Sequence, residues 1–137
     1  MVLIITQNEK FGRYLKKWLD YKRFRCTLVC DGEEGLQHAQ RDVPCVVVLD
    51  LYVKEPSGMD ILHRLREDGY AGKIILMGGI SVSPMISEAL RLGVDQVIGG
   101  ESNLGPLECA IQSACQPEST RSLSGMIDTQ EQPARSF

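Results

Sequence analysis

The chain has 137 residues, a length that suits one globular domain with its own apolar core. Its net charge of −3 and pI near 5.4 argue against direct nucleic-acid binding, and no apolar run is long enough to cross a membrane. The first residues, Met1–Ile5, lack the basic region and cleavage site of a signal peptide, so a cytoplasmic location is expected.

Apolar runs alternate with amphipathic stretches, which predicts repeated β-α units around a parallel sheet. In chain order, the first predicted elements are a strand over Val2–Ile5, a helix over Glu9–Tyr21, a strand over Arg25–Cys30 and a helix near Glu33–Gln40. The unbroken apolar run Cys45–Leu49 then predicts a central strand that is buried on both faces.

The second half continues the pattern. The predicted elements are a helix from Ser57 or Gly58 to about Asp68, a strand over Lys73–Met77, a helix from Ser83-Pro84 to Leu92, a strand over Gln96–Ile98 and a helix over Leu104–Cys115. Five such units predict a doubly wound α/β sheet of the flavodoxin-like type, with strand order 2-1-3-4-5. The domain is predicted to span residues 1–116, and the polar residues 117–137 are predicted to be a flexible tail or linker.

The cysteines carry no metal-binding or disulfide signature. The chain has five of them, an odd number, and no Cys-x-x-Cys motif: Cys26, Cys30, Cys45, Cys109 and Cys115. Reduced and mostly buried thiols are therefore predicted. The two histidines, His38 and His63, lie on predicted helices away from the strand ends, so no zinc site is expected.

Asp50 carries the main functional signal. It directly follows the buried run Cys45–Leu49, and Gly58 lies eight residues later. This pattern, together with Asp31-Gly32 and Leu92-Gly93, resembles a response-regulator receiver domain over residues 1–116. The resemblance implies a signalling role, with Asp50 as the residue that accepts a phosphoryl group from a histidine kinase in the presence of Mg²⁺.

The positions that would surround the acceptor differ from those of a working receiver. The family places an acidic pair, a hydroxyl and a lysine where this chain has Thr6-Gln7, Gly78 and Gly100. Phosphoryl transfer needs positive charge around the phosphoryl oxygens, and Mg²⁺ prefers carboxylate ligands. The remaining ligands would be Asp50, the Tyr52 carbonyl and the Gln7 side chain, so Mg²⁺ is expected to bind weakly or not at all.

These differences predict an atypical receiver, or pseudo-receiver, that acts through protein contacts without phosphorylation and is not an enzyme. Asp50 is then expected to accept hydrogen bonds from Thr6, Gln7 or loop amides, or to be a solvated remnant. Val97 occupies the position of the family's aromatic switch residue, so that switch is also predicted to be absent. Expected partners are a histidine kinase or an output (effector) domain.

Two alternatives remain open from the sequence. In the first, the chain is a phosphorylatable receiver that accepts a phosphoryl group on Asp50. In the second, Gly78-Gly79 and Gly99-Gly100 form loops that bind a nucleotide-like or cobalamin-like ligand, although Glu9 replaces the histidine that cobalamin-binding domains use. A homodimer through the fourth helix, fifth strand and fifth helix is also considered, with candidate outward residues Glu88, Arg91, Gln96 and Glu108.

Overall fold

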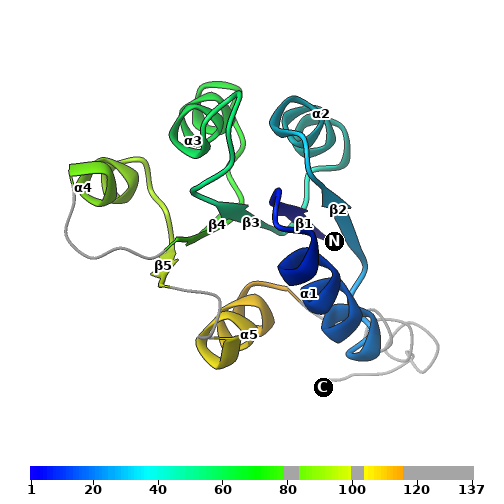
Figure 1. Cartoon of the computed structure of the whole chain (residues 1–137). Helices are drawn as coiled ribbons and strands as arrows, with labels where there is room; N and C mark the ends of the chain where they lie inside the picture. The colour runs from blue at the N-terminus through cyan, green and yellow to red at the C-terminus, as the bar shows by residue number, and fades with distance from the viewer. Residues whose placement is uncertain (79–83, 100–103, 116–137) are drawn as a thin grey trace, which may run out of the picture.

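The computed structural model describes residues 1–78, 84–99 and 104–115, in which strands and helices alternate along the chain (Figure 1). The strands are β1 (Val2–Ile5), β2 (Cys26–Val29), β3 (Val46–Asp50), β4 (Lys73–Met77) and β5 (Gln96–Ile98). The helices are α1 (Glu9–Tyr21), α2 (Gly32–Asp42), α3 (Gly58–Glu67), α4 (Pro84–Arg91) and α5 (Leu104–Ala114). None of the described helices is long and apolar enough to cross a membrane.

The five strands form one parallel sheet in the order β2-β1-β3-β4-β5, which confirms the predicted topology. Helices α1 and α5 cover one face, and α2, α3 and α4 cover the other (Figure 1). Strand order reverses between β1 and β3, and a ligand or reaction site in such a sheet lies at the carboxyl ends of the strands near this reversal. Thr6 and Asp50 both lie at that edge.

Successive strand residues point to opposite faces of the sheet and contribute to two separate hydrophobic cores. Leu3, Val47 and Leu76 point toward α2, α3 and α4, where they pack with Leu36, Ile61, Leu62 and Ala89. Their neighbours point toward α1 and α5 and pack with Phe11, Leu15, Leu107 and Ile111. Burial on both faces explains why the strands read as unbroken apolar runs in the sequence.

Several predicted boundaries differ from the observed ones by one or two residues, and two of these elements show why. Strand β2 is shorter than predicted, because it excludes Arg25 and Cys30, and both of these residues are exposed. Helix α2 runs two residues further than predicted and ends where Val43 adopts a left-handed conformation with φ 44°. A β-branched residue rarely adopts this conformation, so the stop could not be read from the sequence.

Arg66 and Tyr70 tie the amino-terminal edge of the sheet together. The Arg66 guanidinium donates to the carbonyls of Leu92 and Gly93 after α4, at 2.8 Å each, and to those of Tyr70 and Gly72 at 2.7 and 3.2 Å. The buried Tyr70 hydroxyl donates to the Pro44 carbonyl at 2.8 Å, and burial raises the pKa of Tyr70 to about 12.

The structure corrects the prediction that the cysteines are unpaired thiols. Cys45 precedes β3, Cys115 follows α5, and the two are paired as a disulfide with their Cα atoms 5.8 Å apart. Their 70-residue separation explains why sequence spacing gave no signal. Three described cysteines are free, namely Cys26, Cys30 and Cys109.

Candidate functional site

The Asp50 carboxylate ends β3, and both of its oxygens accept hydrogen bonds from this chain. Thr6 Oγ1 donates to Oδ2 at 2.8 Å, and the Tyr52 backbone N–H donates to Oδ1 at 2.9 Å. Of the donors expected for this carboxylate, Thr6 and a loop amide contact it, whereas Gln7 binds Lys54. Hydrogen bonds to an ionised group are among the stronger ones in proteins, so this carboxylate is held in a defined orientation.

Thr6 is the buried polar residue at this edge, with 2% of its surface exposed. Its hydroxyl also accepts the Asn8 N–H at 3.1 Å, and the Asn8 side chain caps α1 by accepting the Phe11 N–H at 3.0 Å. One chain of hydrogen bonds thus connects the start of α1 to Asp50. The same residues that begin the helix also fix the orientation of the candidate site.

Gln7 contacts the β3–α3 loop in place of Asp50. Its Nε2 donates to the Lys54 carbonyl at 3.1 Å, and its Oε1 accepts the Lys54 N–H at 3.1 Å. The side-chain amide thus satisfies both backbone groups of one residue, as a neighbouring strand would. The sequence placed Gln7 at the site but did not reveal this partner, because the contact depends on the path of the loop.

Gly78 adopts a backbone conformation that disfavours any side chain. Its φ is 148°, and a Cβ atom built there would lie 2.8 Å from the Leu51 Cβ and 3.6 Å from Cε2 of Tyr52. A Ser or Thr hydroxyl at this position would therefore require the β3–α3 loop to move. The Tyr52 ring itself is 60% exposed, so it borders the site without being enclosed by it.

The other predicted positions are placed as follows. Val97 is half-buried and packs against the core beneath α2, α3 and α4. Gly79 and Gly100 lie outside the described residues, so the loops of the ligand-sensor alternative are not described. Among residues 1–78, 84–99 and 104–115, no group of three or more His, Cys, Asp or Glu side chains is placed to hold a metal ion.

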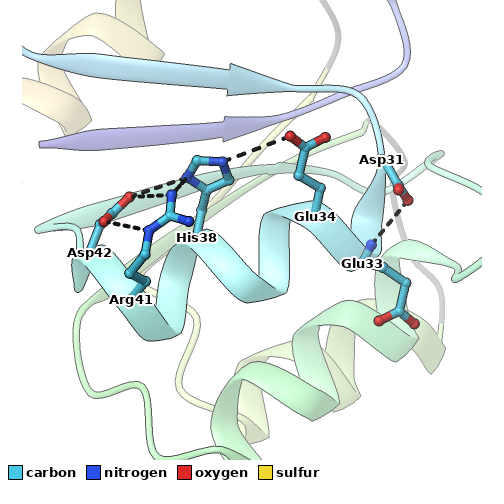
Figure 2. Close-up of polar contacts among 6 residues, drawn as sticks. All are labelled: Asp31, Glu33, Glu34, His38, Arg41 and Asp42. Carbon is cyan, nitrogen blue, oxygen red and sulfur yellow. Dashed lines mark hydrogen bonds and ion pairs between the residues drawn. The ribbon is translucent and has the colours of Figure 1, made fainter.

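A polar network lies along one side of α2 (Figure 2). His38 lies between Glu34 and Asp42, at 3.9 and 3.2 Å, and Arg41 lies 2.8 Å from its Nδ1. Hydrogen bonds from Arg41, and secondly from His38, hold the pKa of the exposed Asp42 carboxyl below its usual range. Glu34, His38 and Asp42 are spaced one helical turn apart, and pairs at this spacing stabilise a helix. The network is therefore explained by helix stabilisation and does not indicate a catalytic or binding site.

A surface on α4, β5 and α5 contains the four residues predicted to face outward. Arg91 and Gln96 are exposed, whereas Glu88 and Glu108 are partly buried. Glu88 contacts His63 of α3 at 2.5 Å, so it is engaged within the chain. Sequence reasoning missed two exposed apolar side chains of α4, Met85 and Leu90, whose exposed fractions are 43% and 56%.

Known proteins with similar sequences point to one family. The sequence matches the family described as response regulator receiver domain over residues 2–112. It is 27% identical over 120 residues to the uncharacterized transcriptional regulatory protein YkoG of Bacillus subtilis, covering 88% of this chain and 53% of that protein. It is 32% identical over 85 residues to the transcriptional regulatory protein CiaR of Streptococcus pneumoniae, covering 62% and 38%. The chain thus spans about half, or less, of these curated relatives.

Solved structures show the same fold. A two-component response regulator from Clostridium difficile superimposes with a TM-score of 0.75 at 21% identity, covering 82% of this chain and 93% of that one. The BeF3-activated receiver domain of Klebsiella pneumoniae RstA gives 0.73 at 17% identity, covering 82% and 96%. Asp50 lies at the carboxyl edge of the sheet, near the reversal of strand order, and the family model matches residues 2–112. The chain therefore belongs to the response regulator receiver domain family.

Proposed function

We propose that this receiver domain signals through protein contacts and does not depend on phosphorylation of Asp50. One observation carries the proposal: both carboxylate oxygens of Asp50 already hold donors from the chain, Thr6 and the Tyr52 amide. A phosphoryl group added to either oxygen would disturb one of these hydrogen bonds. Within the described residues, no group of three or more His, Cys, Asp or Glu side chains is placed to hold a metal ion, and Mg²⁺ sites typically use carboxylate ligands.

The conformation of Gly78 supports the same proposal. A receiver uses a hydroxyl at this position to hold a phosphoryl oxygen, and here the backbone and the Leu51 side chain leave no space for one. Transition-state charge would therefore lack a donor that is already in position. Loss of this group and of the acidic pair favours a module whose remaining function is contact with other proteins.

The partner surface proposed here is formed by α4, β5 and α5. Met85 and Leu90 of α4 are exposed apolar side chains, and Arg91 of α4 and Gln96 of β5 are exposed polar ones. An apolar centre with a polar rim is typical of protein interfaces. A second copy of this chain or an output domain fits this surface. The relatives are transcriptional regulatory proteins of which this chain spans about half or less, so regulation of transcription within a larger assembly is part of the proposal.

Charge on α1 supports a second contact. Residues 9–25 hold seven of the chain's 15 Lys and Arg residues but two of its 18 Asp and Glu residues. Lys10, Arg13 and Lys17 line a shallow hollow of about 540 Å³ together with Tyr14, which is 49% exposed, and Glu9, which pairs with Arg13 at 3.0 Å. A basic surface on an acidic chain steers an acidic protein surface toward one orientation, so a kinase or effector with an acidic patch is the partner proposed for α1.

The decisive experiment is amide NMR of the full chain with Mg²⁺ and then with Mg²⁺ plus beryllofluoride, which mimics a phosphoryl group on Asp. The RstA receiver domain, known in its BeF3-activated form, serves as the positive control. We expect no saturable shifts at Asp50 or Gly78, and no acyl phosphate by mass spectrometry after treatment with acetyl phosphate. Saturable shifts at both residues that disappear in Asp50→Asn would overturn the proposal and establish the phosphorylatable alternative.

A small-ligand sensor is tested separately, because it needs no change at Asp50. Thermal denaturation with nucleotides and with cobalamin would reveal saturable stabilisation if the glycine-rich loops bind either ligand. We expect none. Stabilisation that survives in Asp50→Asn would replace the proposed function with ligand sensing.

A further inference from the structure

The strongest feature outside the Asp50 site is the contact between Cys45 and Cys115. Their Cα atoms are 5.8 Å apart, within the range of about 4.4–6.8 Å that disulfides require. Cys45 lies at the amino-terminal end of the central strand β3 and is hydrogen-bonded to both neighbouring strands. Its N–H donates to Met1 O at 2.9 Å, and its carbonyl accepts the Lys73 N–H at 3.3 Å. Cys115 directly follows α5. The pair therefore joins a helix end to the sheet.

The surroundings suit both redox states of the pair. In the reduced state, the Cys45 thiol has an acceptor, because Met1 O lies 3.2 Å from its sulfur. In the oxidised state, the two sulfurs are already neighbours and α5 need not move. Cys115 has 6% of its surface exposed and Cys45 is partly buried, so Cys45 is the one that an oxidant in solvent reaches first.

The three free cysteines differ from this pair. Cys30 and Cys109 are exposed and have no cysteine partner among the described residues. Cys26 is partly buried, and burial raises the pKa of its thiol, with Asp20 adding to the rise and Lys16 opposing it. A raised pKa lowers the thiolate fraction and hence the reaction with disulfides. Cys45 and Cys115 therefore differ from the other three cysteines because their sulfur atoms are in contact with each other.

We propose that Cys45 and Cys115 are a reversible dithiol–disulfide pair that is oxidised by a disulfide such as oxidised glutathione. The Cys45 thiolate attacks the glutathione disulfide, forms a mixed disulfide and releases one glutathione thiolate. The Cys115 thiolate then displaces the second. Two protein thiols lose two electrons, oxidised glutathione gains them, and the two protons end on the two glutathione molecules.

Oxidation fixes the end of α5 covalently to the sheet. The helix is otherwise held there by side-chain packing, chiefly through Leu107 and Ile111, which are buried in the core beneath α1 and α5. The new bond closes a long loop, and the gain from a disulfide rises with loop length. Because α5 is part of the proposed partner surface, the redox state would set how firmly that surface is held. The bond itself does not depend on the proposed function.

The test uses the full chain in glutathione buffers of rising oxidised fraction, followed by alkylation of free thiols and peptide mass spectrometry. We expect one intramolecular Cys45–Cys115 link that dithiothreitol reverses. Cys30→Ser and Cys109→Ser are matched controls that keep the link, and Cys45→Ser and Cys115→Ser remove it. Oxidation should raise the Tm of the wild type by about 5 °C or more, and this rise should be absent in Cys45→Ser.

Two results would overturn the proposal. One is that Cys45 and Cys115 both remain open to alkylation under conditions that oxidise Cys30 or Cys109. The other is that oxidation yields only links to Cys26, Cys30 or Cys109, or only covalent dimers. Both readings come from the wild-type chain, so the test stands even if a serine variant fails to fold. Partner binding is not measured, so failure here leaves the proposed function unaffected.

Discussion

Thr6 and Asp50, 44 positions apart in sequence, are joined by a 2.8 Å hydrogen bond between the Thr6 hydroxyl and the Asp50 carboxylate. The hydroxyl is buried, and its second partner is the Asn8 amide at the start of α1. In this chain, a neutral donor therefore stands where the family resemblance places a carboxylate that would hold Mg²⁺. The edge of the sheet is stabilised by internal hydrogen bonds.

Removing this donor should destabilise the fold. Thr6→Val keeps the shape of the side chain but removes the hydroxyl that donates to Oδ2 of Asp50 and accepts from the Asn8 N–H. We expect a loss of about 1–2 kcal/mol in the free energy of unfolding, measured by urea denaturation. Thr27→Val, a half-buried position on the edge strand β2, is the matched control and should change stability by less than about 0.5 kcal/mol. Equal effects at both positions would contradict this account of Thr6.

The same Gly→Ala change should have opposite signs at two positions. Gly78→Ala places a Cβ 2.8 Å from the Leu51 Cβ at a φ of 148°, so we expect it to cost about 2 kcal/mol or more. A Cβ at Gly105 in α5 meets no atom within 4 Å, and Gly105→Ala should stabilise the fold by about 0.5 kcal/mol. Chemical denaturation of the two variants decides the point, and a neutral Gly78→Ala would show that the β3–α3 loop adjusts freely.

Arg66 should be a major stabilising residue despite its partial exposure. Arg66→Ala leaves the carbonyls after α3 and α4 without their charged donor, and we expect a loss of about 2 kcal/mol. Arg66→Lys should recover part of this loss, because a lysine cannot reach all of the carbonyls at once. Arg13→Ala removes an exposed i,i+4 ion pair with Glu9 and is expected to cost no more than about 0.5 kcal/mol. Hydrogen exchange of α4 amides should quicken in Arg66→Ala alone.

The raised pKa of Tyr70 predicts that the free energy of unfolding decreases at high pH. Its folded-state pKa is raised to about 12 from an ordinary value near 10, so the unfolded chain releases this proton first. The contribution of Tyr70 is therefore complete below pH 10 and is lost as the pH rises toward 12. The Tm of the wild type should fall more steeply between pH 10 and 12 than that of Tyr70→Phe. Parallel pH profiles would show that lysine deprotonation, common to both proteins, explains the whole decline.

The sequence was sufficient for the architecture and for placing Thr6 and Asp50 at one edge of the sheet. The apolar runs are unbroken, and the glycines and caps between them are clear. The strand order 2-1-3-4-5 was therefore predicted correctly, and the element bounds were predicted to within one or two residues. The end of α2 was missed because Val43 adopts a conformation that its residue type disfavours. Such an exception depends on tertiary packing, which local propensity does not contain.

The contacts within the site were predictable only in part. A hydroxyl next to the end of β1 and a carboxylate at the end of β3 must meet in this topology, so the Thr6–Asp50 bond followed from the fold. The pairing of Gln7 with Lys54 and that of Cys45 with Cys115 did not, because each joins segments whose approach is set by a loop or a helix end.

The concentration of positive charge on residues 9–25 has a practical consequence. Residues 9–25 carry a net charge of +5 (7 − 2), so the rest of the chain carries −8 (−3 − 5), and charge is unevenly distributed along the sequence. Binding to a charged ion-exchange resin depends on local patches of surface charge as well as on the net charge. At neutral pH and low salt, the chain should bind both anion and cation exchangers, and modest salt should release it from the latter first.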